Sequence, residues 1–273
     1  MKVVLFCGGL GLRMGEMTER VPKPMVPVGG RPILWHIMKY FAHYGHREFI
    51  VCLGYQPEVI KKYFLSYDEA LANDFTLSEG GARIDLAHSD LADWKISFVD
   101  TGRQSNIGER LQRVRAHLAG DEFFLAQYGD TLTDAPLSTL VDDLVSSGKV
   151  ANFLSVRPNN YSFHTVESDS GGTVRSVKDI LGADLWINGG YFVLRHDVFD
   201  FMNPGEELVH EPFQRLIERG LLLTHRHHGF WAPMDTLKDR QTLETMAENG
   251  VPPWAVWERQ PPDAAVVPIA HAS

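Results

Sequence analysis

A glycine-rich stretch near the amino terminus is followed by two basic residues, a combination typical of phosphate-binding sites. Glycines stand at positions 8, 9 and 11, directly after a short apolar run, and Arg13 and Lys23 come soon after them. Glycine lets backbone N–H groups come close to an anion, and the two cations add charge nearby. The stretch therefore predicts a site for a phosphorylated ligand. The alternative is a plain surface turn with solvated charges.

Two common phosphate-binding motifs do not fit this stretch. The dinucleotide fingerprint needs a third glycine where Met14 stands, and an acidic residue after the second strand, which runs into Gly54 and Tyr55. The phosphate loop of ATPases, G-x-x-x-x-G-K-[ST], does not occur in the sequence. Two cations beside the glycines instead favour a polyphosphate that carries more charge than a dinucleotide.

Two isolated carboxylates are candidates for a metal site. Asp130 follows a strongly apolar strand, and Asp235 stands just before a predicted helix. In a parallel α/β sheet the carboxyl ends of the strands face the ligand crevice, where carboxylates suit Mg²⁺. The alternatives are a turn residue for Asp130 and a helix N-cap for Asp235. The histidine-rich run at 225–229 is a weaker candidate for zinc, because at most two of its imidazoles can converge from one short strand.

The hydrophobic pattern places these candidates between alternating strands and helices. This order indicates an α/β fold with a mostly parallel sheet. Residues 66–93 are polar, and we predict irregular structure there. The predicted strands are 2–7, 48–53, 95–100, 123–128, 151–156, 162–167, 173–177, 188–195 and 221–226. The predicted helices are 32–41, 57–64, 108–118, 137–146, 208–219 and 236–249.

The composition is that of an ordinary globular protein with an excess of acidic residues. The 273 residues are enough for one large core, and the net charge of −9 argues against nucleic-acid or membrane partners. Cys7 and Cys52 lie in apolar runs, which favours buried, reduced thiols. There is no signal-peptide pattern and no long apolar run, so we expect a cytoplasmic protein. We expect a disordered tail over 258–273, which is rich in Pro and Ala.

Longer stretches of the sequence resemble the sugar-nucleotide pyrophosphorylases, a family of nucleotidyltransferases, and within it the cytidylyltransferase branch. The resemblance is carried by CGGLGLRM, VPKPMVPVGGRPILWHIMKYF, VDTGRQSNIGERLQRV, YGDTLTD, INGGYFVL and GFWAPMDTLKDRQTLE. It implies one Rossmann-like nucleotide-diphospho-sugar transferase domain over 1–257. Such a domain has a mixed, mostly parallel twisted sheet that is flanked by helices.

The resemblance also implies a reaction. An oxygen of a sugar 1-phosphate, with glucose 1-phosphate expected, attacks the α-phosphorus of CTP, and pyrophosphate leaves. The protein needs no nucleophile of its own, because the attacking atom belongs to the substrate. Catalysis then consists of positioning and charge neutralisation. The implied partners are these small molecules, with a homo-oligomer as a further expectation.

By the same resemblance, Arg13 contacts the triphosphate and Lys23 contacts the reacting phosphates. Asp130 and Asp235 share Mg²⁺, the implied cofactor. For a further member of the site, Arg110, the residue pattern alone also allows a cation on a helix surface. The implied nucleotide-binding residues are Cys7, Gly8, Gly9, Leu10, Gly11, Leu12, Arg13, Lys23, Ser105, Arg110 and Gly129. The implied acceptor-binding residues are Tyr128, His164, Asp179, Asn188 and Trp231.

Three positions depart from the family pattern. Leu12 replaces the usual Thr or Ser, His164 stands where glycine is expected, and Ile180 stands where a lysine normally binds the sugar phosphate. Apart from Leu12, the nucleotide half of the motif set is thus intact, whereas the acceptor half is altered. The alternatives are therefore a transferase for another phosphorylated or phosphonate acceptor, and a nucleotide-binding regulatory protein without turnover. A nicotinamide oxidoreductase is disfavoured, because the dinucleotide fingerprint lacks both its third glycine and its acidic residue after the second strand.

Overall fold

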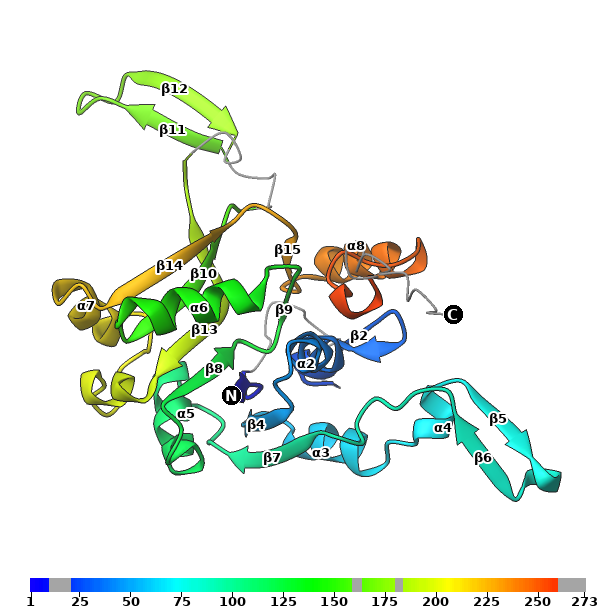
Figure 1. Ribbon diagram of the computed structural model, residues 1–273. Coiled ribbons are helices and arrows are strands. Elements are labelled where there is room, and N and C mark those ends of the chain that lie inside the picture. Colours follow the sequence, from blue (N-terminus) through cyan, green and yellow to red (C-terminus); the bar gives the residue numbers. More distant parts are fainter. Residues whose placement is uncertain (10–20, 159–163, 180–183, 260–273) are drawn as a thin grey trace, which may run out of the picture.

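A seven-stranded sheet forms the centre of the computed structural model, which describes residues 1–9, 21–158, 164–179 and 184–259 (Figure 1). Its strands are β1 (Lys2–Phe6), β4 (Glu48–Leu53), β7 (Lys95–Asp100), β8 (Phe123–Gln127), β10 (Ala151–Val156), β13 (Ile187–Arg195) and β14 (Leu222–His227). Their order in space is β14-β10-β13-β8-β1-β4-β7. β13 is antiparallel to both of its neighbours, and the other adjacent pairs are parallel. The predicted mixed, mostly parallel sheet is confirmed.

Side chains alternate along the buried strands and build a hydrophobic core on each face of the sheet. In β1, Val3 and Leu5 belong to one core, and Val4 and Phe6 belong to the other. The first core also contains residues of α2 (Ile33–His43), α3 (Pro57–Leu65), α6 (Leu137–Ser147) and α8 (Leu237–Glu248). The second contains residues of α5 (Ile107–Val114) and α7 (Glu211–Glu218). The predicted helices therefore flank the sheet on both faces.

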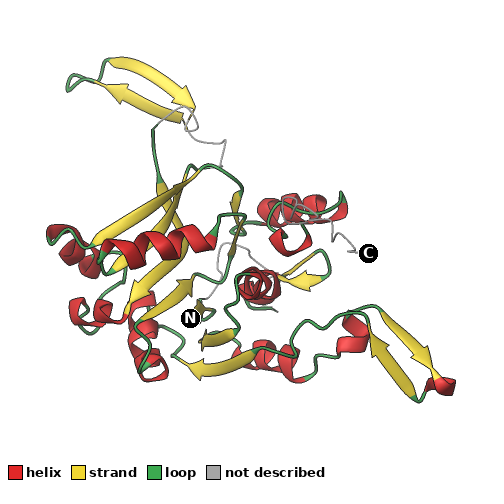
Figure 2. Cartoon of the chain, in the orientation of Figure 1, coloured by secondary structure: helices red, strands yellow, loops and turns green. Residues whose placement is uncertain are grey.

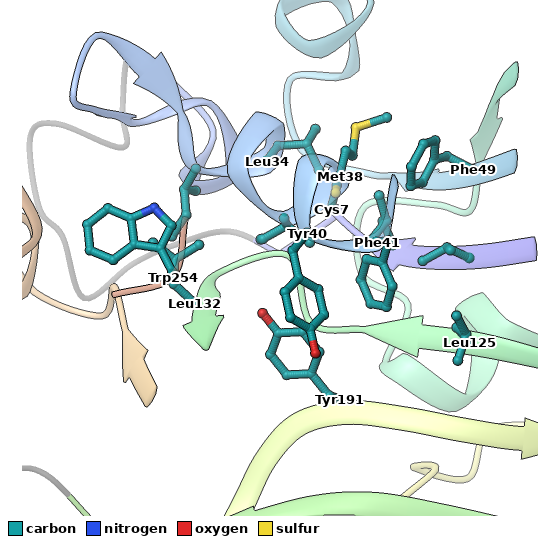
Figure 3. Packing of buried hydrophobic residues seen from close by; sticks show 14 of the residues in the cluster. Cys7, Leu34, Met38, Tyr40, Phe41, Phe49, Leu125, Leu132, Tyr191 and Trp254 are labelled. Atoms are coloured by element: carbon teal, nitrogen blue, oxygen red, sulfur yellow. The ribbon is translucent and has the colours of Figure 1, made fainter. Parts of the chain in front are cut away.

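Helix α2 anchors the first core and the carboxyl-terminal segment of the described chain. Its Tyr40 and Phe41 rings lie 5.5 and 5.9 Å, centroid to centroid, from the ring of Tyr191 on β13 (Figure 3). His36 is buried, with Nε2 donating to a backbone carbonyl of β2 (Pro27–Val28) and Nδ1 accepting from Trp254 Nε1. Burial lowers the pKa of His36 to about 4, so the ring is neutral at neutral pH.

The order of the strands changes direction at β1. β4 and β7 are added on one side of β1, whereas β8 lies on the other side. In open α/β sheets ligands bind at such a switch point, just beyond the carboxyl ends of the two strands. Here those ends lead into residues 7–9 and 128–130. The topology therefore brings the predicted phosphate loop next to the turn that carries Asp130.

Two antiparallel hairpins project from the body of the molecule (Figure 2). One, β5 (Phe75–Ser78) with β6 (Arg83–Leu86), follows the short helix α4 (Glu69–Ala72), and the other pairs β11 (His164–Ser168) with β12 (Val174–Asp179). The prediction of irregular structure over 66–93 is wrong, because α4 and the first hairpin lie there. The remaining strands are β3 (Arg31–Pro32), β9 (Thr131–Thr133) and β15 (Trp231–Pro233), and the 3-10 helices are η2 (Lys23–Met25), η3 (Glu79–Gly81), η4 (Arg115–Leu118), η6 (His196–Phe201) and η7 (Val256–Glu258).

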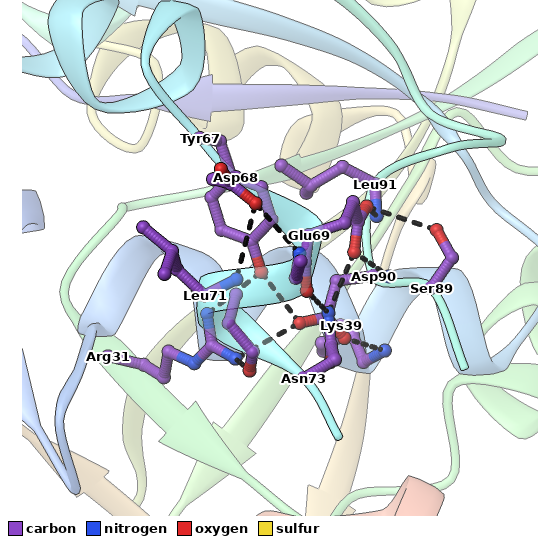
Figure 4. A network of polar contacts seen from close by, with 12 residues as sticks. Arg31, Lys39, Tyr67, Asp68, Glu69, Leu71, Asn73, Ser89, Asp90 and Leu91 are labelled. Carbon is purple, nitrogen blue, oxygen red and sulfur yellow. Dashed lines mark hydrogen bonds and ion pairs between the residues drawn. The ribbon is translucent and has the colours of Figure 1, made fainter. Parts of the chain in front are cut away.

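A polar network fixes the segment between α3 and β7 to α2 (Figure 4). The buried carboxylate of Asp90 accepts from Lys39 Nζ at 2.7 Å, from Tyr67 Oη at 2.7 Å and from an Arg31 nitrogen at 3.3 Å. Burial raises the pKa of Asp90, but these hydrogen bonds and charges outweigh burial and hold the pKa below its ordinary value. The projecting hairpin therefore has a firmly held base.

The predicted tail begins within ordered structure. Glu258 ends η7, and Arg259 lies with Nη1 3.7 Å from the carboxylate of Asp134. The rest of the predicted tail, 260–273, lies outside the described residues.

Candidate active site

A pocket of about 620 Å³ opens at the switch point between β1 and β8. Its wall combines residues from the amino-terminal loop, the β8–β9 turn, β13 and the loop before α8. The lining residues are Phe6, Gly9, Lys23, Pro24, Tyr128, Gly129, Asp130, Thr131, Ile187, Asn188, Gly189, Trp231, Pro233 and Asp235. Lys23 and both predicted metal carboxylates therefore share one cavity.

A short ladder brings the two carboxylates together, although they are far apart in the chain. Asp130 immediately precedes β9, and Asp235 follows closely after β15. These strands are antiparallel, with Thr131 opposite Pro233. Beyond that pair, the N–H of Met234 donates to the backbone carbonyl of Asp130 at 2.9 Å. The ladder and this hydrogen bond thus hold the backbone at Asp130 next to the backbone at Asp235.

The ammonium group of Lys23 lies between these two carboxylates. Its Nζ is 2.7 Å from Asp130 Oδ2 and 2.6 Å from Asp235 Oδ1, and the Lys23 side chain is only 13% exposed. Burial lowers the pKa of Lys23, but the charge of Asp130 and the hydrogen bonds to both carboxylates outweigh burial. They hold the pKa above its ordinary value, so Lys23 is charged at neutral pH.

The two carboxylates offer the ligand type that a hard divalent cation needs. Because both contact one nitrogen atom, Asp130 and Asp235 are near enough to share an ion. Mg²⁺ is usually held by one or two protein carboxylates together with substrate phosphates and water. Among the residues that the structure describes, no group of three or more His, Cys, Asp or Glu side chains is arranged to hold a metal. The donor set therefore fits a cation that is held jointly by protein and phosphate.

Arg110 is buried next to Gly8 and does not lie on the helix surface. Its guanidinium donates to Gly8 O at 3.0 Å, to Leu53 O at 3.1 Å and to Thr101 Oγ1 at 2.7 Å. A Cβ atom at Gly8 would lie 2.0 Å from Arg110 Nη1, so a larger residue there would force the guanidinium to move. Arg110 thus connects the end of β1 to the end of β4. The alternative of a surface cation is excluded by this burial.

Ser105 and Cys7 lie close to this arrangement but do not line the pocket. Ser105 Oγ donates to Thr101 O at 2.5 Å. Burial raises the pKa of the Cys7 thiol well above its ordinary value, so Cys7 is a neutral thiol at neutral pH. A role for Cys7 as a nucleophile is therefore disfavoured. The predicted nucleotide contacts of both residues stay predictions.

Three predicted acceptor residues are held in the pocket wall by hydrogen bonds. Asn188 Nδ2 donates to Tyr128 Oη at 2.9 Å. Trp231 Nε1 donates to the carbonyl of Gly189 at 2.8 Å. Aromatic rings with fixed polar edges are suited to line a sugar site, because they offer an apolar face together with directed hydrogen bonds.

The other two predicted acceptor residues lie away from the pocket. His164 and Asp179 are cross-strand neighbours on the β11–β12 hairpin, with His164 Nε2 3.0 Å from Asp179 Oδ1. Their side chains are 56% and 73% exposed, and neither lines the cavity. The hairpin extends outward from the sheet (Figure 1). Its register therefore pairs the two side chains with each other. The predicted acceptor contacts of His164 and Asp179 stay predictions.

Part of the predicted site cannot be placed. Leu10, Gly11, Leu12 and Arg13 lie outside the described residues, and so does Ile180.

The histidine-rich run makes separate contacts that do not converge on one point. His225 Nδ1 is 3.0 Å from Asp143 on α6, whereas His227 Nε2 is 2.8 Å from Asp134 Oδ1. Asp134 also accepts from the N–H of Phe230 at 2.7 Å. Sequence reasoning missed this role of Asp134, which closes the far end of the β9–β15 ladder. The only sequence signal was its place in YGDTLTD.

Comparison with known proteins agrees with this geometry. The sequence profile described as nucleotidyl transferase matches residues 2–232. The chain belongs to the nucleotidyl transferase family. It is 40% identical over 260 residues to the glucose-1-phosphate cytidylyltransferase of Salmonella typhi, an alignment that covers 94% of this chain and 100% of that protein.

Another similar protein is named for a different base and sugar. This nucleotidyl transferase is 29% identical over 241 residues to the D-glycero-alpha-D-manno-heptose 1-phosphate guanylyltransferase of Campylobacter jejuni, covering 86% of this chain and 96% of that one. The crystal structure of HddC from Yersinia pseudotuberculosis has a TM-score of 0.63 and 16% identity, covering 91% of this chain and 98% of that chain. The last likeness shows the fold alone. In the described part of the chain, no helix combines the length and hydropathy of a membrane crossing.

Proposed function

We propose that this enzyme condenses CTP with glucose 1-phosphate to give a CDP-sugar and pyrophosphate. The observation that carries the proposal is the convergence of Lys23, Asp130 and Asp235 in one cavity beside the glycine loop. The choice of base and sugar is supported by the full-length similarity to a glucose-1-phosphate cytidylyltransferase.

The reaction requires two anions to approach one another. An oxygen of the sugar phosphate bonds to the α-phosphorus of CTP, the bond to the bridging oxygen breaks, and its electron pair leaves with pyrophosphate. Two unit charges 4 Å apart interact with about 4 kcal/mol at an effective dielectric constant of about 20. The charged Lys23 lowers this repulsion. Mg²⁺, held by Asp130 and Asp235 when bound, would supply further neutralisation.

The two halves of the cavity take different roles in this proposal. Gly8 and Gly9 present the backbone to the triphosphate, together with Arg13, while Arg110 holds the Gly8 carbonyl in place. Ser105 is assigned to the nucleotide. The sugar contacts Tyr128, Asn188 and Trp231, which line the cavity near the β13 end.

The deciding experiment measures pyrophosphate release for four nucleoside triphosphates crossed with a panel of sugar 1-phosphates. We expect CTP with glucose 1-phosphate to give the highest kcat/KM, and Asp130→Asn to lower kcat by several orders of magnitude. Asp143→Asn is the matched control, because Asp143 contacts His225 outside the cavity. A purine preference would remove the CTP assignment, and a different preferred sugar would remove glucose 1-phosphate.

We also propose that the enzyme is a cytoplasmic homo-oligomer. The β5–β6 hairpin exposes four large apolar side chains, and its register places them on one face. They are Phe75, Leu77, Ile84 and Leu86. An exposed apolar hairpin is marginally stable in water unless another surface covers it, and a second copy would do so. The buried free cysteines suit a reducing compartment. Light scattering of the wild type and of Leu77→Lys tests the association.

A further inference from the structure

The last residue of β8 is a polar side chain in a fully buried position. Gln127 has no exposed surface, although the residues before it, Leu125 and Ala126, belong to the hydrophobic cores. A buried amide destabilises a protein unless its donor and acceptor groups are paired. The partners of Gln127 therefore indicate why an amide stands there.

Both ends of this amide bond to the backbone around Asp130. The N–H of Gly129 donates to Gln127 Oε1 at 2.5 Å. Gln127 Nε2 donates to Thr131 O at 3.0 Å and to Thr131 Oγ1 at 2.9 Å. The side chain thus joins the residue before Asp130 to the residue after it.

The turn that carries Asp130 has a conformation that needs such support. Gly129 has a φ of +81°, and a Cβ atom there would lie 2.8 Å from the carbonyl oxygen at the end of β1. On the other side of the turn, Thr131 O also accepts from Tyr191 Oη at 2.7 Å. Thr131 then begins β9, which pairs with β15. The amide therefore connects the sheet to the ladder that sets the two carboxylates side by side.

We propose that Gln127 is a positioning residue for the metal-binding carboxylate. Its buried amide holds the turn in the geometry that lets Asp130 and Asp235 share one divalent cation. The inference rests on the proposed function, because the metal is assigned to these carboxylates there. Some groups hold a metal ligand in position without contacting the metal themselves. Removing such a group typically changes metal affinity or activity by about 10- to 100-fold.

The test replaces the amide with an apolar side chain of similar size. In Gln127→Met, the Mn²⁺ dissociation constant of the full chain with a non-hydrolysable CTP analogue, measured by electron paramagnetic resonance, is expected to rise about 10- to 100-fold. Asn152→Leu is the matched control, because it removes another buried amide, one that donates to Leu140 O at 2.9 Å. It is expected to lower the melting temperature similarly and to leave the Mn²⁺ constant within about twofold of the wild type.

The outcomes separate this inference from the proposed function. If the wild type does not bind Mn²⁺, or if Asp130→Asn binds it equally well, the proposed metal site is wrong and the inference falls with it. If the wild type binds Mn²⁺ and Gln127→Met keeps the wild-type constant, or if Asn152→Leu raises the constant as much as Gln127→Met does, only the inference is overturned.

A second variant covers the case in which Gln127→Met does not fold. Thr131→Val removes one acceptor of the amide and leaves the Gly129 N–H paired. The Mn²⁺ constant is then expected to rise about 2- to 10-fold, as for the loss of one hydrogen bond. An unchanged constant in this variant also overturns the inference.

Discussion

Replacing Lys23 with methionine is expected to change metal affinity and turnover in opposite directions. Because Lys23 Nζ contacts both Asp130 and Asp235, a cation that binds both carboxylates must displace the ammonium group. Each of these partly exposed ion pairs contributes about 1 kcal/mol after solvent screening. Without them, the metal should bind the nucleotide-free enzyme about 2 kcal/mol more tightly, or roughly 30-fold.

Turnover should fall in the same variant. Lys23 is a preorganised charge beside the reacting phosphates in the proposed mechanism, and removing one such group typically lowers kcat by about 10²- to 10³-fold. Tighter metal binding does not restore this loss, because a metal at the two carboxylates does not replace the positive charge of the lysine.

Mn²⁺ titration of the nucleotide-free protein measures the first effect, and initial rates with saturating substrates measure the second. Lys39→Met is the matched control. Its Nζ lies 2.7 Å from Asp90 in the network that anchors the β5–β6 segment, and its side chain is 20% exposed. We expect neither quantity to change in this control. Mn²⁺ affinity that is unchanged or weaker in Lys23→Met would refute the idea that the ammonium competes with the metal.

Three further changes test other parts of the structure. The pKa of His36 is lowered by burial from 6.5 to about 4, so its contribution to stability is complete above pH 6.5 and is lost as the pH falls to 4. Urea denaturation should show a loss of about 3 kcal/mol over this window, and His36→Gln should lack that component. Gly8→Ala should lower the free energy of unfolding by about 1–3 kcal/mol, because its Cβ would overlap with Arg110. Gly9→Ala should change it little, because no atom of the described residues lies within 4 Å of a Cβ built there. Equal effects of the two substitutions would contradict this interpretation of the loop. His164→Gly should alter kcat/KM for glucose 1-phosphate by less than about twofold, because the side chain does not line the cavity. A larger change would indicate that His164 contacts the acceptor.

The parallel part of the sheet could be predicted from the sequence with little error. The strands β1, β4 and β8 are buried on both faces and therefore appear as continuous apolar runs. Once these runs alternate with helices, the general rule for open sheets places the glycine loop and Asp130 at one edge. The β5–β6 hairpin was missed because its short strands project from the body and lack a long apolar run.

The role of Arg110 depended on tertiary structure. In the sequence it is a cation in an amphipathic helix, where a solvent-exposed side chain is the usual outcome. In the folded chain the ends of β1 and β4 present the carbonyls of Gly8 and Leu53 to the same guanidinium. Gly8 and Leu53 are far from Arg110 in the sequence. The periodicity of a helix gives no information about contacts with such distant segments.

By itself, the sequence determined the family, the class of fold and the identity of the charged residues at the switch point. Only the tertiary structure decided that the Lys23 ammonium group contacts both Asp130 and Asp235. The proximity of the two carboxylates depends on the three-residue ladder between β9 and β15. The tertiary structure also decided that His164 pairs with Asp179 on a projecting hairpin. Residue types and spacing report local geometry, whereas contacts between distant segments are set by the register in which strands pair.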